Sequence, residues 1–177
     1  MGRFRRSTSM ALFAISALLT VSAGPTAAAA PLTAAVTPDL DGRAIALGQS
    51  AAWHCHDLDF PRIHCFRSEA DLARVLATRT GKPQTDAAGV AAVTAYVIAY
   101  RDATYGGPSI AISQNYDDLR VIGWNDTISS FKAVNGLRGH FATDAFNGGR
   151  SFAFCCNVTV PYVGDAWNDQ FSSVYSW

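Results

Sequence analysis

Two short segments of the chain carry oxygen-bearing side chains in the same order. The first runs from Trp124 to Ser130 and the second from Trp167 to Ser173, and five of their seven positions are identical. Each segment offers an aspartate carboxylate, an asparagine amide oxygen, serine hydroxyls and backbone carbonyls. Ca²⁺ takes about six to eight such oxygen ligands, and one formal negative charge per segment predicts weak binding. The competing interpretation is that Asn, Asp and Ser only close turns here.

Signatures of the common enzyme classes are missing from the sequence. It has no Gly-x-Ser-x-Gly, no His-Glu-x-x-His and no phosphate-binding loop. Glu69 is the only glutamate, so a paired-carboxylate site would have to be built from aspartates. We therefore expect a protein that is not an enzyme.

The N-terminus predicts export. Three arginines precede an apolar run from Met10 to Val21, and small residues follow. This order is typical of a secretory signal peptide, and the run is short for a membrane span. We assign residues 1–30 to the signal peptide, with cleavage after Ala23, Ala28 or Ala30, and expect a secreted protein without membrane attachment.

The charge of the exported chain argues against nucleic acid as a partner. The whole sequence has 14 basic and 14 acidic residues, and the signal peptide contains three of the arginines and no acid, which leaves a net charge of −3. Phosphate binding requires a basic face.

Four cysteines, at positions 55, 65, 155 and 156, are an even number, which in an exported chain favours disulfides, and we expect all four to be oxidised. A bridge from Cys55 to Cys65 is the local option and leaves Cys155 and Cys156 as neighbours. Two long bridges from the N-terminal segment to that pair are the rival arrangement. A zinc site that also uses His54, His56 and His64 is the third reading, but its spacing fits no common zinc pattern.

Elements of two kinds follow the signal peptide. Residues 31–48 have the composition of a linker. Residues 49–90 contain two of the cysteines and a short helix, which Ser68 caps and which we expect from Glu69 to about Thr78. Residues 92–177 contain short β-type runs separated by Gly, Asn and Asp, which predicts an all-β sandwich. The expected strands are 94–100, 108–113, 119–122, 129–134, 150–155 and 172–177.

A repeat divides residues 92–177 into two units. The two oxygen-rich segments are 43 residues apart, and an aromatic-glycine pattern upstream of each recurs at an offset of 41. That pattern pairs Tyr100, Tyr105 and Gly107 with Phe141, Phe146 and Gly148. Repeats of this length are supersecondary units, and four short antiparallel strands per unit would make a Greek key.

At these residues the chain resembles the βγ-crystallin family. The turn from Tyr100 to Gly107 resembles the family's Greek-key signature, and Asp144 in the second copy lies one position off that pattern. The segments 125–130 and 168–173 both match the family's calcium motif, [Asn/Asp]-[Asn/Asp]-x-x-[Ser/Thr]-Ser. The resemblance implies a βγ-crystallin-like sandwich of two Greek keys, preceded by the helix-containing segment.

The resemblance also implies up to two Ca²⁺ sites, because in that family a backbone segment of one key completes the loop of the other. One site would use the side chains of Asp126 and Ser129 with the carbonyl of Thr127, and the second would use Asp169 and Ser172 with the carbonyl of Gln170. Asn125 and Asn168 would orient the loops, and the crossing segments would lie around Gly106–Gly107 and Asn147–Gly148.

The function implied is that of a secreted, monomeric, non-enzymatic calcium-binding protein. Two alternatives share the fold. One is an inhibitor of an extracellular protease, such as a metalloprotease, and the other is a killer-toxin-like antimicrobial that acts on a cell-surface target.

Overall fold

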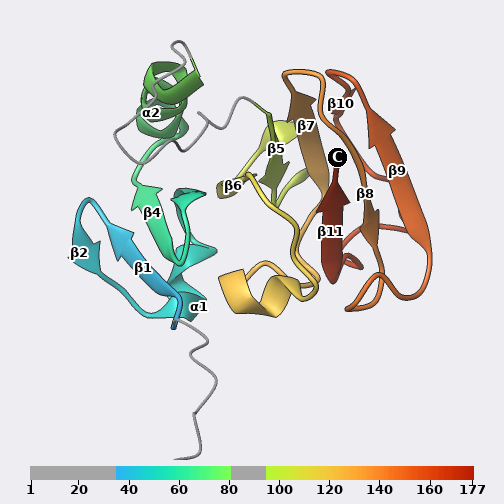
Figure 1. The fold of residues 1–177 in the computed structure, drawn as a ribbon, viewed down its shortest axis with the longest axis horizontal. Coiled ribbons are helices and arrows are strands. Elements are labelled where there is room, and N and C mark those ends of the chain that lie inside the picture. The colour runs from blue at the N-terminus through green and yellow to red at the C-terminus, as the bar shows by residue number, and fades with distance from the viewer. Residues whose placement is uncertain (1–34, 81–94) are drawn as a thin grey trace, which may run out of the picture. The chain divides into compact units, whose positions relative to one another are not determined.

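The computed structural model describes residues 35–80 and 95–177, and the signal peptide expected over 1–30 lies outside them (Figure 1). The described residues belong to one compact unit, Ala34–Trp177. Its elements, in chain order, are β1 (Thr37–Leu40), β2 (Arg43–Ala44), α1 (Leu47–Ser50), β3 (His54–Asp59), β4 (Arg62–Phe66), α2 (Glu69–Thr80), β5 (Tyr96–Tyr100), the 3₁₀ helix η1 (Ala103–Tyr105), β6 (Ser109–Ile112), the 3₁₀ helix η2 (Leu119–Ile122), β7 (Ser130–Val134), β8 (Arg138–Ala142), β9 (Ser151–Cys155), β10 (Thr159–Val160) and β11 (Ser173–Ser176).

The strands form two sheets. The larger has the order β10-β7-β5-β6-β3-β4-β1-β2, and the smaller has the order β11-β8-β9. Within residues 96–177 all strand pairs are antiparallel. This confirms the expected all-β sandwich.

The two Greek keys exchange their third strands. In the first key, β6, β5 and β7 lie side by side in the larger sheet, while Tyr116 crosses over and forms a bridge with Val174 of β11. In the second key, β9, β8 and β11 lie side by side in the smaller sheet, while β10 crosses over and pairs with β7. Each key thus completes the sheet of the other, which confirms the expectation of two related Greek keys.

Backbone hydrogen bonds fix the register of the two keys. The N–H of Asp102 donates to the glycine carbonyl four residues later at 3.2 Å, and the N–H of Asp144 does the same at 3.1 Å. These two aspartates therefore correspond, at an offset of 42. The alignment at offset 41 is wrong, because it pairs Phe146 with Tyr105 by aromatic type, whereas the backbone puts Phe146 in the place of Thr104. The apparent departure of Asp144 from the turn pattern disappears with it.

Residues 119–122, expected as a strand, form the 3₁₀ helix η2 instead. Leu119 and Ile122 are both buried, and a spacing of three residues places them on one side of a 3₁₀ turn. The carboxylate of Asp118 accepts from the N–H of Arg120 at 2.9 Å and caps the first turn. Gly123 ends the helix with a φ of +76°, a conformation that glycine adopts without strain.

The N-terminal segment is an extension of the larger sheet. Strand β3 pairs in parallel with β6 of the first key, and β4, β1 and β2 continue the sheet outward. The linker expected over residues 31–48 is therefore wrong for residues 37–48, which form β1, β2 and the start of α1. Helix α2 confirms the helix expected from Glu69, and it ends at Thr80.

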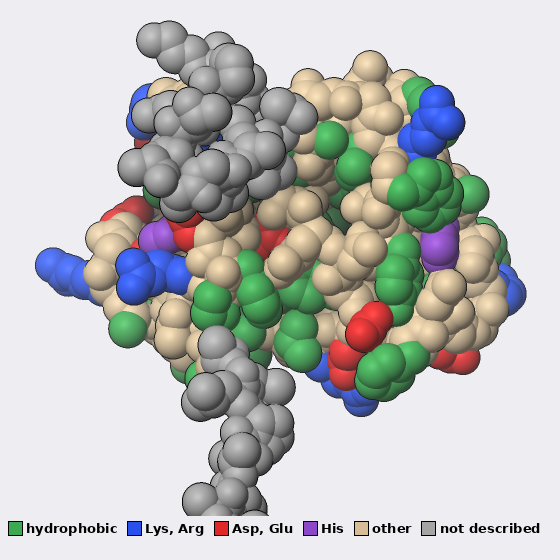
Figure 2. Space-filling view, viewed as in Figure 1, with side chains coloured by type: hydrophobic (Ala, Val, Ile, Leu, Met, Phe, Trp, Pro, Cys, Tyr) green, Lys and Arg blue, Asp and Glu red, His purple; other side chains and the backbone are tan. Residues whose placement is uncertain are grey.

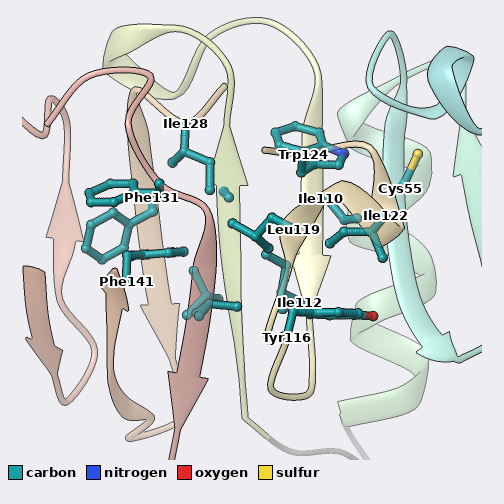
Figure 3. Packing of buried hydrophobic residues seen from close by; sticks show 14 of the residues in the cluster. Cys55, Ile110, Ile112, Tyr116, Leu119, Ile122, Trp124, Ile128, Phe131 and Phe141 are labelled. Atoms are coloured by element: carbon teal, nitrogen blue, oxygen red, sulfur yellow. The ribbon is translucent and has the colours of Figure 1, made fainter. Parts of the chain in front are cut away.

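Apolar side chains form two clusters. The larger lies between the two sheets and beneath η2, and Figure 3 shows Phe131 beside Phe141 in it. Burial of side chains of this size contributes about 1.5–3 kcal/mol each. The smaller cluster lies under α2, where Leu72 and Leu76 pack on the outer face of the larger sheet.

The cysteines form two short bridges. Cys55 and Cys65 are direct cross-strand partners on β3 and β4, and their disulfide is fully buried. Cys155 and Cys156 are joined to each other, and both are exposed. The local option is therefore the one adopted, and the two long bridges are not formed.

Candidate metal site

The two oxygen-rich segments, here called loop 1 (Asn125–Ser130) and loop 2 (Asn168–Ser173), each follow a tryptophan that packs in the core. Trp124 is fully buried, and Trp167 is half-buried against Phe152 and Phe171. Each loop leads directly into the last strand of its key, β7 or β11. The loops are therefore held at both ends by the sandwich.

The loops are joined to each other by a reciprocal pair of backbone hydrogen bonds. The N–H of Asp126 donates to the carbonyl of Phe171 at 2.9 Å, and the N–H of Asp169 donates to the carbonyl of Ile128 at 3.3 Å. Both aspartates have left-handed backbones, with φ of 53° and 55°, a region that Asp tolerates better than most residues. Both aspartates are exposed, so their carboxylates can meet an ion from solvent.

The aspartate of loop 1 meets the serine of loop 2. The hydroxyl of Ser172 donates to a carboxylate oxygen of Asp126 at 3.3 Å. This differs from the expected grouping, in which Asp126 shared a site with Ser129 of its own loop. Ser129 is buried and lies beside the first turn, where its N–H donates to the carbonyl of Tyr100 at 3.0 Å.

The side chains of the two asparagines bond to the neighbouring carboxylates. The side-chain amide of Asn125 donates to Asp126 at 2.5 Å, and that of Asn168 donates to Asp169 at 2.8 Å. Thr127 and Gln170, expected to act through their carbonyls, follow the two aspartates directly; the Thr127 hydroxyl donates to the carbonyl of Trp124 at 2.9 Å.

The last serine of each loop has a structural role that the sequence analysis did not assign. The buried hydroxyl of Ser130 donates to the carbonyl of Asp102 at 2.6 Å, and that of Ser173 donates to the carbonyl of Asp144 at 2.8 Å. These hydroxyls tie each loop to the turn of its own key. The signal was present in the sequence, because the second serine recurs in both loops.

A cavity of about 500 Å³ lies between the loops and the first turn. It is lined by Ala52, Arg101, Asp102, Pro108, Asp126, Thr127 and Asp169. Three of the eight predicted site residues, Asp126, Thr127 and Asp169, thus line one cavity. They come from both loops and share the cavity with Asp102, which was not predicted. The expected crossing segment around Gly106–Gly107 adjoins it through Pro108. Asn147, from the other expected crossing segment, is bonded to His140 instead.

The charges around the cavity favour a cation. Three carboxylates face one guanidinium, that of Arg101, which donates to the carbonyl of Ala51 at 3.0 Å. Close by, the hydrogen bond that the Arg120 guanidinium donates to Asp118 raises the pKa of Arg120, and the charge of Asp126 raises it further. Within residues 35–80 and 95–177 no three acidic, histidine or cysteine side chains converge as a ready metal cluster. A bound ion would therefore need hydroxyl, carbonyl and water oxygens as well, which suits Ca²⁺.

The zinc reading is contradicted by the structure. Both of its cysteines are consumed by the Cys55–Cys65 disulfide. His54 Nδ1 lies 3.0 Å from the hydroxyl of Ser109, and the two ring nitrogens of His64 face different carboxylates. Burial lowers the pKa of His56 to about 4.

Among the residues that the structure describes, no helix is both long and apolar enough to span a bilayer.

Comparison with known proteins gives no family model and no curated protein that matches the chain. Among solved structures, the chain is similar to a βγ-crystallin domain from Clostridium beijerinckii, with 26% identity, a TM-score of 0.42, and coverage of 46% of this chain and 97% of that domain. It is also similar to a βγ-crystallin from Ciona intestinalis, with 27% identity, a TM-score of 0.41, and coverage of 46% and 99%. A βγ-crystallin domain from Flavobacterium johnsoniae gives 27% identity, a TM-score of 0.41, and coverage of 46% and 92%.

Proposed function

We propose that this chain is a secreted, non-enzymatic protein whose residues 96–177 form a βγ-crystallin-type domain that binds Ca²⁺ between its two loops. The observation that carries the proposal is the reciprocal pairing of the loops. Asp126 and Asp169 open onto one cavity, and the hydroxyl of Ser172 already lies 3.3 Å from Asp126. The signal-peptide pattern and the disulfides support secretion, because such bonds persist in oxidising compartments.

Each ion would be held by residues of both keys. We assign Asp126 with Ser172 to one site and, from the matched backbone hydrogen bonds of the loops, Asp169 with Ser129 to the other. The carbonyls of Thr127 and Gln170 would complete the protein ligands, and Asn125 and Asn168 would hold the carboxylates in place. Ca²⁺ would supply charge neutralisation and a cross-link between the keys.

The direct test is thermal unfolding with and without the ion. A ligand that binds only the folded state stabilises it by about 2.7 kcal/mol at 100 times its dissociation constant. We expect the melting temperature to be higher in millimolar CaCl₂ than in chelator. Asp126→Ala and Asp169→Ala should each remove most binding at one site, whereas Asp165→Ala, which removes an exposed carboxylate outside the loops, should change nothing. Identical melting curves in Ca²⁺ and chelator would mean that both loops are only turns.

The pairing of ligands across the keys has its own test. If Asp126 and Ser172 share an ion, the double variant Asp126→Ala/Ser172→Ala should lose little more Ca²⁺ affinity than Asp126→Ala alone. Asp126→Ala/Ser129→Ala should lose the sum of its two single effects, because Ser129 would belong to the other site. Calorimetric titration measures both, and the reverse result would restore the grouping by loop.

A further inference from the structure

The outer face of the smaller sheet carries an aromatic strip, defined by His140 on β8, Tyr175 on β11, Trp177 and Phe146. The rings of His140 and Tyr175 are stacked, with centroids 5.6 Å apart and planes 21° apart, and the ring of Trp177 lies 5.7 Å from that of His140. Trp177 is 72% exposed and Phe146 is 74% exposed. Figure 2 shows hydrophobic side chains beside a histidine over β8 and β11 on this face.

The equivalent face of the larger sheet is covered. At the offsets set by the backbone, Ile98 and Val134 hold the places of His140 and Trp177. Both pack against the cluster that contains Leu72 and Leu76 of helix α2. The strip has no such cover from the described residues, so the two related sheets present one apolar face to a helix and one aromatic face to solvent.

The turn beside the strip exposes its aromatic residue, whereas the equivalent turn of the first key packs its aromatic residue on a neighbouring ring. In the first key Tyr105 packs on Tyr100, with ring centroids 5.6 Å apart. In the second key the corresponding residue is Asn147, and the aromatic residue is Phe146, one position earlier and exposed to solvent. Phe146 also has a φ of +56°. The equivalent Thr104 of the first key has the same backbone, with a φ of +55°, so the left-handed conformation belongs to the turn of both keys and the second key places a bulky ring on it.

Polar groups line the edges of the rings. The side-chain oxygen of Asn147 lies 2.5 Å from His140 Nε2, and the hydroxyl of Tyr175 donates to Asp117. Amide, carboxylate and imidazole groups have further donor or acceptor capacity that hydroxyls of a ligand could use. The large exposed side chains of the strip are aromatic, and the cross-strand partner of His140 is the small residue Ala153. A sugar ring fits this arrangement, since its C–H face meets the negative face of an aromatic ring and its hydroxyls meet the polar edges.

The charge of the strip indicates a neutral ligand. Arg138 lies beside it on β8, and Asp117 and the exposed Asp144 lie near Phe146, so charges of both signs flank the strip. A nucleic acid also stacks on aromatic rings, but it needs a positively charged groove. The backbone N–H of Asn147, next to Phe146, donates to the hydroxyl of Ser173, so the strip extends from Trp177 to about the level of Ser173, which is about 14 Å at 3.4 Å per residue. This length accommodates several linked sugar units.

We propose that the aromatic strip binds a neutral oligosaccharide. This site is separate from the two calcium loops, and the proposal stands whether or not those loops bind Ca²⁺. It gives a secreted protein a chemical means of attaching to a cell-surface or extracellular glycan.

The test uses calorimetry and tryptophan fluorescence with cellotetraose, chitotetraose and mannotetraose, each measured in Ca²⁺ and in chelator. We expect at least one of them to bind in both conditions. Trp177→Ala should weaken its binding by about tenfold, the loss expected for one aromatic contact. Val121→Ala, which shortens an exposed side chain away from the strip, should leave it unchanged.

Phe146→Asn separates binding from folding. Asn tolerates the left-handed backbone better than Phe, so this variant should melt at the same or a higher temperature while it binds the tetrasaccharide several-fold more weakly. A fall in melting temperature with unchanged affinity would mean that Phe146 is a packing residue and would overturn the proposal.

Three further results would also overturn it. The first is no binding of any of the three tetrasaccharides up to about 10 mM, a concentration that covers weak single-site affinities. The second is binding only of an anionic heparin hexasaccharide with steep salt dependence, which would indicate an electrostatic site. The third is a concentration-dependent dimer in sedimentation that Phe146→Asn dissolves, which would make the strip an interface between copies of the chain.

Discussion

A buried carboxylate joins the N-terminal extension to the first Greek key, and its titration should be measurable. Asp57 on β3 is 1% exposed. One of its oxygens accepts from the N–H of Ser113 at 2.8 Å, and the other accepts from the hydroxyl of Tyr116 at 2.8 Å. Burial raises its pKa to about 6, and the two hydrogen bonds limit the rise.

The raised pKa of Asp57 makes the stability of the fold depend on pH. The folded protein holds the proton more tightly than the unfolded chain, because the folded pKa lies above the ordinary value of 3.8. Asp57 therefore stabilises the fold in acid, fully below about pH 3.8, and this contribution is lost as the pH rises through 6. Between pH 7 and pH 5 the gain on acidification is about 1.3 kcal/mol.

Asp57→Asn isolates this gain. The amide keeps the size of the side chain and cannot titrate. His56 works in the opposite direction, because its pKa is lowered to about 4 by burial, but it is present in both proteins and cancels from their difference. Urea unfolding in chelator should show that the parent protein gains about 1.3 kcal/mol relative to Asp57→Asn when the pH is lowered from 7 to 5.

The companion variant is Tyr116→Phe. It removes one hydrogen bond to the carboxylate, so the pKa of Asp57 should rise further and the difference from Asp57→Asn should extend to higher pH. If the difference between the parent protein and Asp57→Asn is the same at pH 7 and at pH 5, Asp57 is hydrated in solution and the extension does not dock as described here.

Two further predictions concern stability. Gly139→Ala would put a Cβ atom against the backbone carbonyl of Tyr175 and should lower the free energy of unfolding by about 2–3 kcal/mol. The control is Gly48→Ala, whose Cβ atom would meet open space and should change that free energy little. Urea unfolding compares the two variants, and equal curves would contradict the packing of β8 on β11. Replacing Cys55 and Cys65 by alanine removes a bridge with a sequence separation of 10 and should lower the free energy of unfolding by about 2–3 kcal/mol through loop entropy. Replacing Cys155 and Cys156 by serine should lower it much less, because that bond closes no chain loop. Calorimetric melting of the two double variants distinguishes these outcomes, and equal losses of stability would rule out the loop-entropy explanation.

The local features of the second half of the chain were predictable because short stretches of sequence encode them. The recurrence of Asn-Asp and Ser-Ser placed both loops correctly, since these residues favour turns for reasons internal to the segment. Alternating β-branched and aromatic residues placed β5, β6, β7, β9 and β11 within a few residues. The run at 119–122 failed because four apolar-rich residues fit a strand and a 3₁₀ turn equally well, and the cap by Asp118 decides between them.

The tertiary structure alone decided which distant segments meet. Parallel pairing of β3 with β6 converts an expected separate segment into part of the larger sheet, and no local pattern encodes a strand partner more than fifty residues away. The same holds for Ser172, which the sequence assigned to its own loop and the sandwich places beside Asp126.

The sequence by itself therefore determined the turns, the loop chemistry and the number of repeats, because steric and hydrogen-bonding preferences act within a few residues. The exchange of third strands, the bridge between Cys55 and Cys65, and the exposure of Phe146, which takes the place of Thr104, were decided by which strands pair and how the sheets pack. Side-chain burial and strand pairing are properties of these contacts. The backbone therefore had to decide between repeat offsets of 41 and 42, and it places Asn147, not Phe146, where Tyr105 packs on Tyr100 in the first key.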